Sequence, residues 1–210
     1  MQVVEVLQDG AAVVNESSVL GIYTRSIATC AGYVFYGRDG FALIHDTGQL
    51  AIPSMVEVAR KCGPLNKTFL VYNPLKESKS QKSSHRDRLA RIRGALNLKN
   101  APIKVPTTSG DAFFLRDGNH GTMLSALSEL ISTIPNRDQR LCINELNNLF
   151  ASRNAQSLPV DLQFFDGAYR PLPSLLWRIE DMISRADAEL RGGDGDYHAY
   201  LKKAQHLGIL

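Results

Sequence analysis

The sequence is poor in cysteine and has no long apolar run. Its 210 residues include only three cysteines, which lie far apart at positions 30, 62 and 142. An odd number without a paired spacing argues against a disulfide scaffold and a cysteine-based metal site, so we expect no metal and no cofactor. The isolated thiols favour a reducing compartment. No run reaches the roughly 18 apolar residues that a membrane-spanning helix needs, and we expect no membrane span.

The beginning of the chain also lacks the basic segment and long apolar stretch of a secretory signal. We therefore expect a cytoplasmic protein, or an effector delivered into the cytoplasm of another cell by a specialised route. Hydrophobic residues make up 44% of the chain and charged residues 21%, which is typical of a globular domain with its own core. No internal repeat is visible.

Short apolar segments separated by turn residues fill the first 72 positions. They predict strands at Val3–Leu7, Ala11–Val14, Val19–Thr24, Cys30–Tyr36, Phe41–His45 and Thr68–Tyr72. Residues 53–63 begin with proline, end with glycine and carry an apolar stripe, which predicts a helix with Cys62 in its core. We expect an α/β fold with a strand-rich core, either a β-sandwich or a mixed sheet flanked by helices.

The remainder of the chain has longer amphipathic patterns. We expect residues 1–118 to form the α/β core and residues 119–210 to form a helical portion packed on or beside it. Helices are predicted at 123–133, 137–152, 174–191 and 197–207, with one strand at 160–165. The C-terminal half is thus expected to be mostly helical.

Residues 76–104 form a basic segment. They contain nine Lys or Arg residues and two acidic residues, a net charge of +7, whereas the whole chain is only +3. We expect residues 78–84 to be an exposed mobile loop, residues 85–98 to form a basic helix, and His85 to be exposed. Such a segment can bind an anionic partner, or it can be an ordinary solvated surface. It lacks aromatic residues, which disfavours nucleic acid.

The residues with the clearest chemical potential are Cys30 and His45. The turn signal Gly37-Arg38-Asp39-Gly40 separates their two apolar segments and predicts a hairpin. If Tyr36 lies opposite Phe41, His45 faces Gly32 and Cys30 faces Thr47. Cys30 and His45 then lie diagonally on one sheet face, with Cβ atoms roughly 7 Å apart or less. Gly32 is expected to leave room for the imidazole.

This pairing depends on a turn of two or four residues centred on Arg38-Asp39. A turn of Asp39-Gly40 alone separates the thiol and the imidazole too far, and a three-residue turn puts them on opposite faces. A buried cysteine is also a common core residue, and His45 can be a satisfied core histidine. A base beside the thiol would activate it as a nucleophile.

The stretch from residue 19 to residue 50 resembles the Cys–His glutamine deamidase superfamily. This superfamily includes the chemoreceptor glutamine deamidases of bacterial chemotaxis and the catalytic domain of cytotoxic necrotizing factor toxins, with N-terminal asparagine amidohydrolases as more distant relatives. Thr24 precedes Cys30 by six residues, as in the chemotaxis enzymes, and His45 follows it by fifteen, as in the toxins. The chain departs from the chemotaxis pattern at Ala28-Thr29-Cys30 and after His45.

The resemblance implies a catalytic triad of Cys30, His45 and Thr24. Cys30 would be the nucleophile, His45 its base, and Thr24 the residue that orients the imidazole. Thr29, Asp46 and Thr47 are candidates for lining the site, and Asp46 and Thr47 compete with Thr24 for the orienting role. The substrate would be a protein with a target Gln, converted to Glu through a thioester.

Three classes of function remain open. The first is a protein glutamine deamidase, and the second is another Cys–His amidohydrolase, such as a thiol protease or an N-terminal amidase. The third is a non-enzymatic module that binds an anionic partner through residues 76–104. If Cys30 is paired with a base, we expect it to react with a mild alkylator faster than Cys62 or Cys142.

Overall fold

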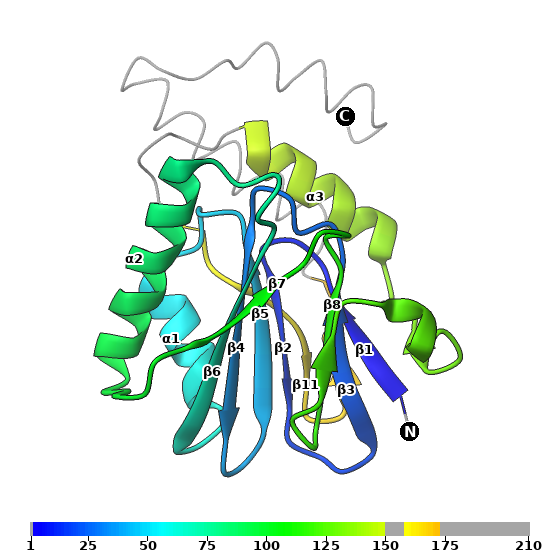
Figure 1. Ribbon diagram of the computed structural model, residues 1–210. Coiled ribbons are helices and arrows are strands. Elements are labelled where there is room, and N and C mark those ends of the chain that lie inside the picture. Colours follow the sequence, from blue (N-terminus) through cyan, green and yellow to red (C-terminus); the bar gives the residue numbers. More distant parts are fainter. Residues whose placement is uncertain (1, 150–157, 173–210) are drawn as a thin grey trace. The chain divides into compact units, whose positions relative to one another are not determined.

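The computed structural model describes residues 2–149 and 158–172 (Figure 1). The chain divides into two compact units. One unit comprises residues 1–134 and 156–170, and the other comprises residues 135–155 and 171–210. The described element of the second unit is helix α3 (Arg137–Leu149), within the span predicted to be helical. The helices predicted at 174–191 and 197–207 lie outside the described residues.

The first unit is a strand-rich mixed α/β structure, as predicted. Its seven-stranded sheet has the order β12-β11-β2-β5-β4-β6-β7. These strands are β12 (Ala168–Tyr169), β11 (Asp161–Phe165), β2 (Gly10–Val14), β5 (Phe41–Asp46), β4 (Ala31–Gly37), β6 (Leu65–Tyr72) and β7 (Ile103–Pro106). The six strands and the 53–63 helix predicted in the first 72 residues are all present, the helix as α1 (Ile52–Arg60).

A five-stranded sheet, in the order β10-β1-β3-β8-β9, completes the unit. Its strands are β10 (Ile131–Ser132), β1 (Gln2–Val6), β3 (Val19–Thr24), β8 (Ala112–Leu115) and β9 (His120–Gly121). Buried side chains of both sheets form one apolar cluster, to which Ile22 of β3, Val34 of β4 and Leu43 of β5 belong. The two sheets therefore pack face to face around this layer.

The opposite face of the seven-stranded sheet is covered by helices. Helix α1 and helix α2 (Lys79–Ala95) pack there, and Tyr33 and Phe35 of β4 share a cluster with Met55 of α1 and Leu89 of α2. Both faces of β4 and β5 are thus buried, which explains why their sequences are continuous apolar runs rather than alternating ones. The fold combines the sandwich and the helix-flanked sheet that the sequence offered as alternatives.

The hairpin of β4 and β5 has the predicted register. Tyr36 pairs with Phe41, and Gly32 pairs with His45. The amide of Gly37 donates to the carbonyl of Gly40 across the turn, at 2.8 Å. The turn therefore has four residues, the length that places Cys30 and His45 on the same face of the hairpin.

The prediction of a mobile loop at residues 78–84 is wrong, and so is the prediction that His85 is exposed. Helix α2 begins at Lys79, and Ser78 and Gln81 form a capping box in which each side chain bonds the other residue's backbone amide. His85 is buried, and its Nδ1 lies 2.6 Å from Glu77 Oε1. The Ser- and Lys-rich composition resembled a loop, while the cap and this buried contact favour helix.

The prediction of a helix at 123–133 is also wrong. A single 3₁₀ turn, η1 (Leu124–Leu127), is followed by strand β10, which pairs in parallel with the edge of β1. Strand β11 confirms the strand predicted at 160–165, and it adds to the sheet beside β2. The described residues after 118 thus contain short strands as well as α3, and a mostly helical C-terminal half is not shown.

Candidate active site

Thr24 and His45 meet across the two sheets. Thr24 ends β3 in the five-stranded sheet, and His45 lies near the end of β5 in the seven-stranded sheet. Thr24 Oγ1 is 2.8 Å from His45 Nδ1, and both side chains are buried. Thr24, rather than Asp46 or Thr47, is therefore the side chain that holds the ring.

The hydrogen bonds of Thr24 assign the tautomer of His45. Thr24 Oγ1 also lies 2.7 Å from the carbonyl oxygen of Val6. A carbonyl can only accept, so the single hydroxyl proton of Thr24 goes to Val6, and Oγ1 accepts from an N–H at His45 Nδ1. His45 Nε2 is then the unprotonated nitrogen. Among the described residues it has no hydrogen-bond partner, and it is buried.

Burial lowers the pKa of His45 to about 4, so the ring is neutral at pH 7. A neutral imidazole that carries its proton on Nδ1 has a free lone pair on Nε2. Nε2 can therefore accept a proton, and the hydroxyl group of Thr24 fixes the orientation of the ring from the other side.

Cys30 lies one residue before β4, beside the pair that Ala31 forms with Asp46. Its side chain is buried, and the described residues provide no hydrogen bond between its sulfur and His45 Nε2. Burial, followed by the charges of Asp9 and Asp46, raises the pKa of the Cys30 thiol to about 12, while a hydrogen bond with Thr29 acts in the opposite direction. The thiol and the imidazole are thus both neutral, and they do not form an ion pair.

The burial and protonation of the thiols determine how fast each cysteine is expected to react with an alkylating reagent. Cys62 follows α1 in the apolar core, and burial raises its pKa to about 12 as well. Cys142 is only half-buried. Burial and a raised pKa both disfavour alkylation of Cys30 and Cys62, whereas Cys142 is more accessible, so we predict faster alkylation at Cys142 than at Cys30.

Gly32 lies opposite His45 in the hairpin and is also closely packed by other side chains. A Cβ at this position would lie 3.0 Å from Val71 Cβ and 3.3 Å from Ile27 Cδ1. The nearest neighbours are thus Val71 and Ile27 rather than the imidazole of His45. Glycine at this position permits close packing of β4 against β6 and the segment after β3.

Asp46 anchors the loop that follows His45. Its Oδ2 lies 2.7 Å from Arg88 Nε of α2, and its Oδ1 accepts from the amides of Gly48 and Leu50 at 2.8 and 3.3 Å. Arg88 also donates to the Leu50 carbonyl at 2.5 Å. Both partners of this ion pair are buried. Asp46 therefore fixes the loop between β5 and α1 against helix α2.

Thr47 bonds to a residue that the sequence did not suggest. Its amide and its Oγ1 both donate to Asp9 Oδ1, at 3.1 and 2.8 Å. Asp9 lies in the turn between β1 and β2 and is buried. Asp9 is followed by glycine, a combination typical of turns, and no local pattern connects Asp9 with residue 47.

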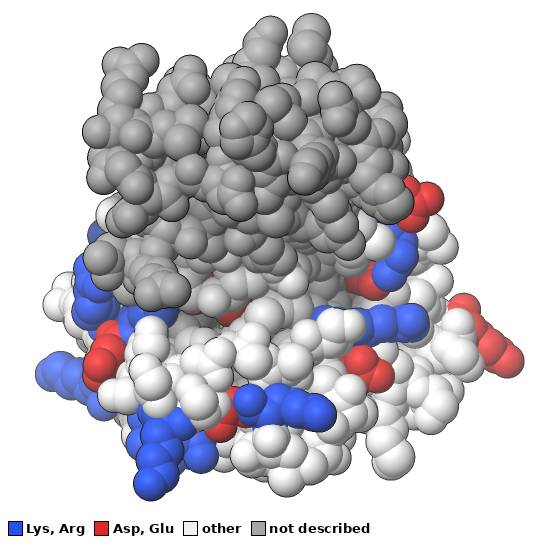
Figure 2. Space-filling model, turned by 90° about the horizontal axis from the view of Figure 1, so that it is seen from above, with Lys and Arg blue, Asp and Glu red and all other residues white. Residues whose placement is uncertain are grey.

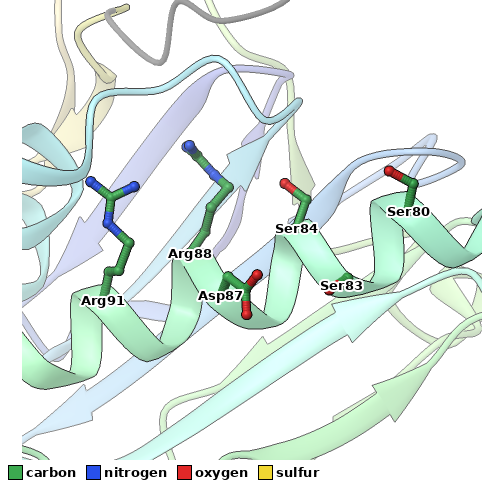
Figure 3. A pocket seen from close by; sticks show the side chains of 6 residues that line it. All are labelled: Ser80, Ser83, Ser84, Asp87, Arg88 and Arg91. Carbon is green, nitrogen blue, oxygen red and sulfur yellow. The ribbon is translucent and has the colours of Figure 1, made fainter.

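The basic segment presents part of its charge on the surface. Lys and Arg side chains gather at the α2 edge of the face shown in Figure 2. A hollow of about 400 Å³ follows α2, and its described lining is Ser80, Ser83, Ser84, Asp87, Arg88 and Arg91. Ser80, Ser84, Arg88 and Arg91 project to the same side of the helix (Figure 3). Arg88 is engaged with Asp46, so the local positive charge is smaller than the sequence indicates.

The described residues contain no group of three or more His, Cys, Asp or Glu side chains that could hold a metal ion. No helix in the described ranges is long and apolar enough to cross a membrane. Comparison of the sequence with protein-family models and with curated proteins gives no match.

Proposed function

We propose that the protein is a cysteine-dependent amidohydrolase that acts as a protein glutamine deamidase. The observation that carries this proposal is the bond between Thr24 and His45, which leaves Nε2 of a neutral imidazole as a buried free base beside the segment of Cys30. The Thr24-to-Cys30 interval resembles that of the chemotaxis deamidases, and the Cys30-to-His45 interval resembles that of the toxins. Both intervals support the assignment of the nucleophile.

Acylation begins with a neutral pair. His45 Nε2 takes the proton of the Cys30 thiol as sulfur attacks the carboxamide carbon of a Gln side chain, so charge develops only during the reaction. The imidazolium then returns this proton to the departing nitrogen. Ammonia leaves, and a thioester between Cys30 and the substrate remains.

Deacylation uses the same base. His45 Nε2 takes a proton from water, which attacks the thioester carbon, and the imidazolium protonates the departing Cys30 sulfur. The product is Glu, and the enzyme regains a neutral thiol and a neutral imidazole. Thr24 accepts from Nδ1–H throughout, so it keeps Nε2 directed toward the reaction and stabilises the transient cation.

The free thiol agrees with a reducing cytoplasm, either that of the producing cell or that of a recipient cell reached as an effector. The alternative amidohydrolases, a thiol protease or an N-terminal amidase, would use the same three residues. They differ in the bond that is broken, so the identity of the product separates them.

A second candidate function is a non-enzymatic module that binds an anionic protein through α2. The exposed side chains of Lys79, Arg86 and Arg91 on this helix favour it. It requires neither Cys30 nor His45, so a Cys30→Ser variant would retain its binding completely.

The test is incubation of the wild-type protein with unfolded Gln-containing proteins, followed by intact-mass and peptide mass spectrometry. We expect ammonia release and a gain of about one mass unit at Gln without cleavage of the chain. Cys30→Ser abolishes this change, while Cys142→Ser serves as the matched control. Cleaved chains would indicate a protease, and equal activity of the Cys30→Ser protein would contradict the proposal.

A further inference from the structure

Asp9 is a buried carboxyl group whose second oxygen is unused. Its Oδ1 accepts both hydrogen bonds from Thr47, whereas Oδ2 is buried and has no hydrogen-bond partner among the described residues. Asp9 also has φ of +55°, a conformation that Asp tolerates better than most residues. A buried acceptor that lacks a donor is costly, and such groups need an explanation.

The position of Asp9 relates it to the proposed nucleophile. Ala31 pairs with Asp46, so continuing the register by one residue places Cys30 opposite Thr47. Thr47 in turn is fixed by Asp9. After burial, the charge of Asp9 also contributes to the raised pKa of the Cys30 thiol. Asp9 is therefore bonded to the residue that stands opposite Cys30 when the hairpin register is continued.

We propose that Asp9 is a specificity-determining residue whose Oδ2 accepts a hydrogen bond from the –NH₂ group of a substrate carboxamide, which selects primary amides over peptide bonds. This inference rests on the proposed amidohydrolase function. A primary amide has two N–H donors, and an ionised carboxylate can only accept hydrogen bonds, so it pairs with one of these N–H groups. In a peptide bond the nitrogen carries a carbon in place of one hydrogen, so one donor is lost and Oδ2 can be left unpaired. Unpaired buried acceptors are the strongest means of rejecting an analogue.

Ionisation of Asp9 gives a test that needs no variant. Burial raises the pKa of Asp9 to about 6, opposed by the hydrogen bonds from Thr47, reinforced by the charge of Asp46, and opposed also by a side-chain hydrogen bond with Gln8. The other ionisable groups in its surroundings are Cys30 and Asp46, and the Asp161 amide donates to its carbonyl. Only the carboxylate is a pure acceptor, so amide recognition is lost as the pH falls through about 6.

The experiment compares an N-blocked glutaminylglycine peptide with the corresponding glutamate γ-methyl ester, which lacks the –NH₂ group. We measure kcat/KM for ammonia and methanol release between pH 5 and pH 8, in the full chain, at roughly half-unit steps. Any pH dependence that both substrates share, including that from ionisation of Cys30 and His45, cancels in the ratio of amide to ester activity. We expect this ratio to fall about 10-fold or more as Asp9 is protonated.

Asp9→Asn is the matched variant. Its side-chain oxygen can still accept from Thr47, but its –NH₂ group replaces Oδ2 by a donor. We expect the amide-to-ester ratio to fall about 10-fold or more at pH 8 and to lose its dependence on pH near 6. Thr47→Val separates indirect effects, because it removes one hydrogen bond to Oδ1 and leaves the carboxylate.

An unchanged ratio in Asp9→Asn, or a pH-independent ratio in the wild-type protein, overturns the inference while the deamidase function stands. If the wild-type protein releases neither product above the level of Cys30→Ser, the proposed function fails, and this inference fails with it.

Discussion

Thr24 Oγ1 lies between two groups, the carbonyl of Val6 at 2.7 Å and the Nδ1 atom of His45 at 2.8 Å. Because the hydroxyl proton goes to the carbonyl, the imidazole must carry its proton on Nδ1. A single side chain from one sheet thus fixes the protonated nitrogen of a histidine in the other sheet.

Replacement of Thr24 by Val should reduce kcat/KM for Gln deamidation at least about 10-fold, a part of the roughly 10²–10⁴-fold that a positioned base contributes. The variant leaves Nδ1–H of His45 and the Val6 carbonyl without their partner. Thr24→Ser retains the hydroxyl group and should recover most of the activity. Imidazole ¹⁵N NMR provides the second readout, since loss of the fixed Nδ1–H tautomer is not expected from a general loss of stability.

The titration of His45 should be abnormal. Its pKa in the folded protein is about 4, below the ordinary value of 6.5, because burial disfavours the imidazolium. The lowered value adds stability that is fully present above pH 6.5 and is lost as the pH falls through about 4. We expect the His45 ring to remain neutral at pH 5.5 in NMR titrations, and His45→Gln to weaken the acid-induced loss of stability. A normal titration near pH 6.5 would contradict a buried neutral base.

Cysteine labelling should proceed in the order Cys142, then Cys30 and Cys62. Cys142 is half-buried, whereas burial raises the pKa of both other thiols to about 12. At pH 7.5, iodoacetamide followed by peptide mapping measures the three rates. Much faster labelling of Cys30 than of Cys142 would show that the thiol is already a thiolate in the resting protein, and that our neutral-pair description is wrong.

Arg88 should be important for stability although it belongs to the basic helix. Arg88→Met leaves the Asp46 carboxylate buried without its charge partner, and removing one partner of a buried pair costs about 3–5 kcal/mol. Arg86→Met, an exposed arginine on the same helix, is the matched control and should change unfolding free energy by less than about 0.5 kcal/mol. Chemical denaturation measures both. Equal effects would show that the ion pair does not anchor α2.

The hairpin could be predicted from the sequence, because a strong turn and two apolar runs determine the register of β4 and β5. The contact between Thr24 and His45 could not be derived in the same way, since it joins two sheets and no local periodicity describes how sheets pack. The only signal for it in the sequence is the Thr24-to-Cys30 interval, which resembles that of the chemotaxis deamidases. No local pattern connects Asp9 with Thr47 either, because their bonds join separate segments of the chain.

The errors of sequence-based prediction have similar physical causes. Residues 78–84 have a loop-like composition, and the helix is favoured by the Ser78–Gln81 cap and the buried contact of His85 with Glu77. Residues 131–132 form a strand because β1 offers an open edge, which is a property of the assembled sheet. The local preferences of these residues for helix or strand predict neither feature.

The most direct test of the central claim, that Cys30 is a nucleophile activated by His45, is covalent trapping with a diazoketone analogue of glutamine in an N-blocked dipeptide. Intact-mass and peptide mass spectrometry locate and quantify the adduct in the wild-type protein and in His45→Gln. We predict one adduct, on Cys30, that forms at least about 10-fold more slowly in the variant. An adduct confined to Cys142, or equal rates of Cys30 modification in the two proteins, would contradict the claim.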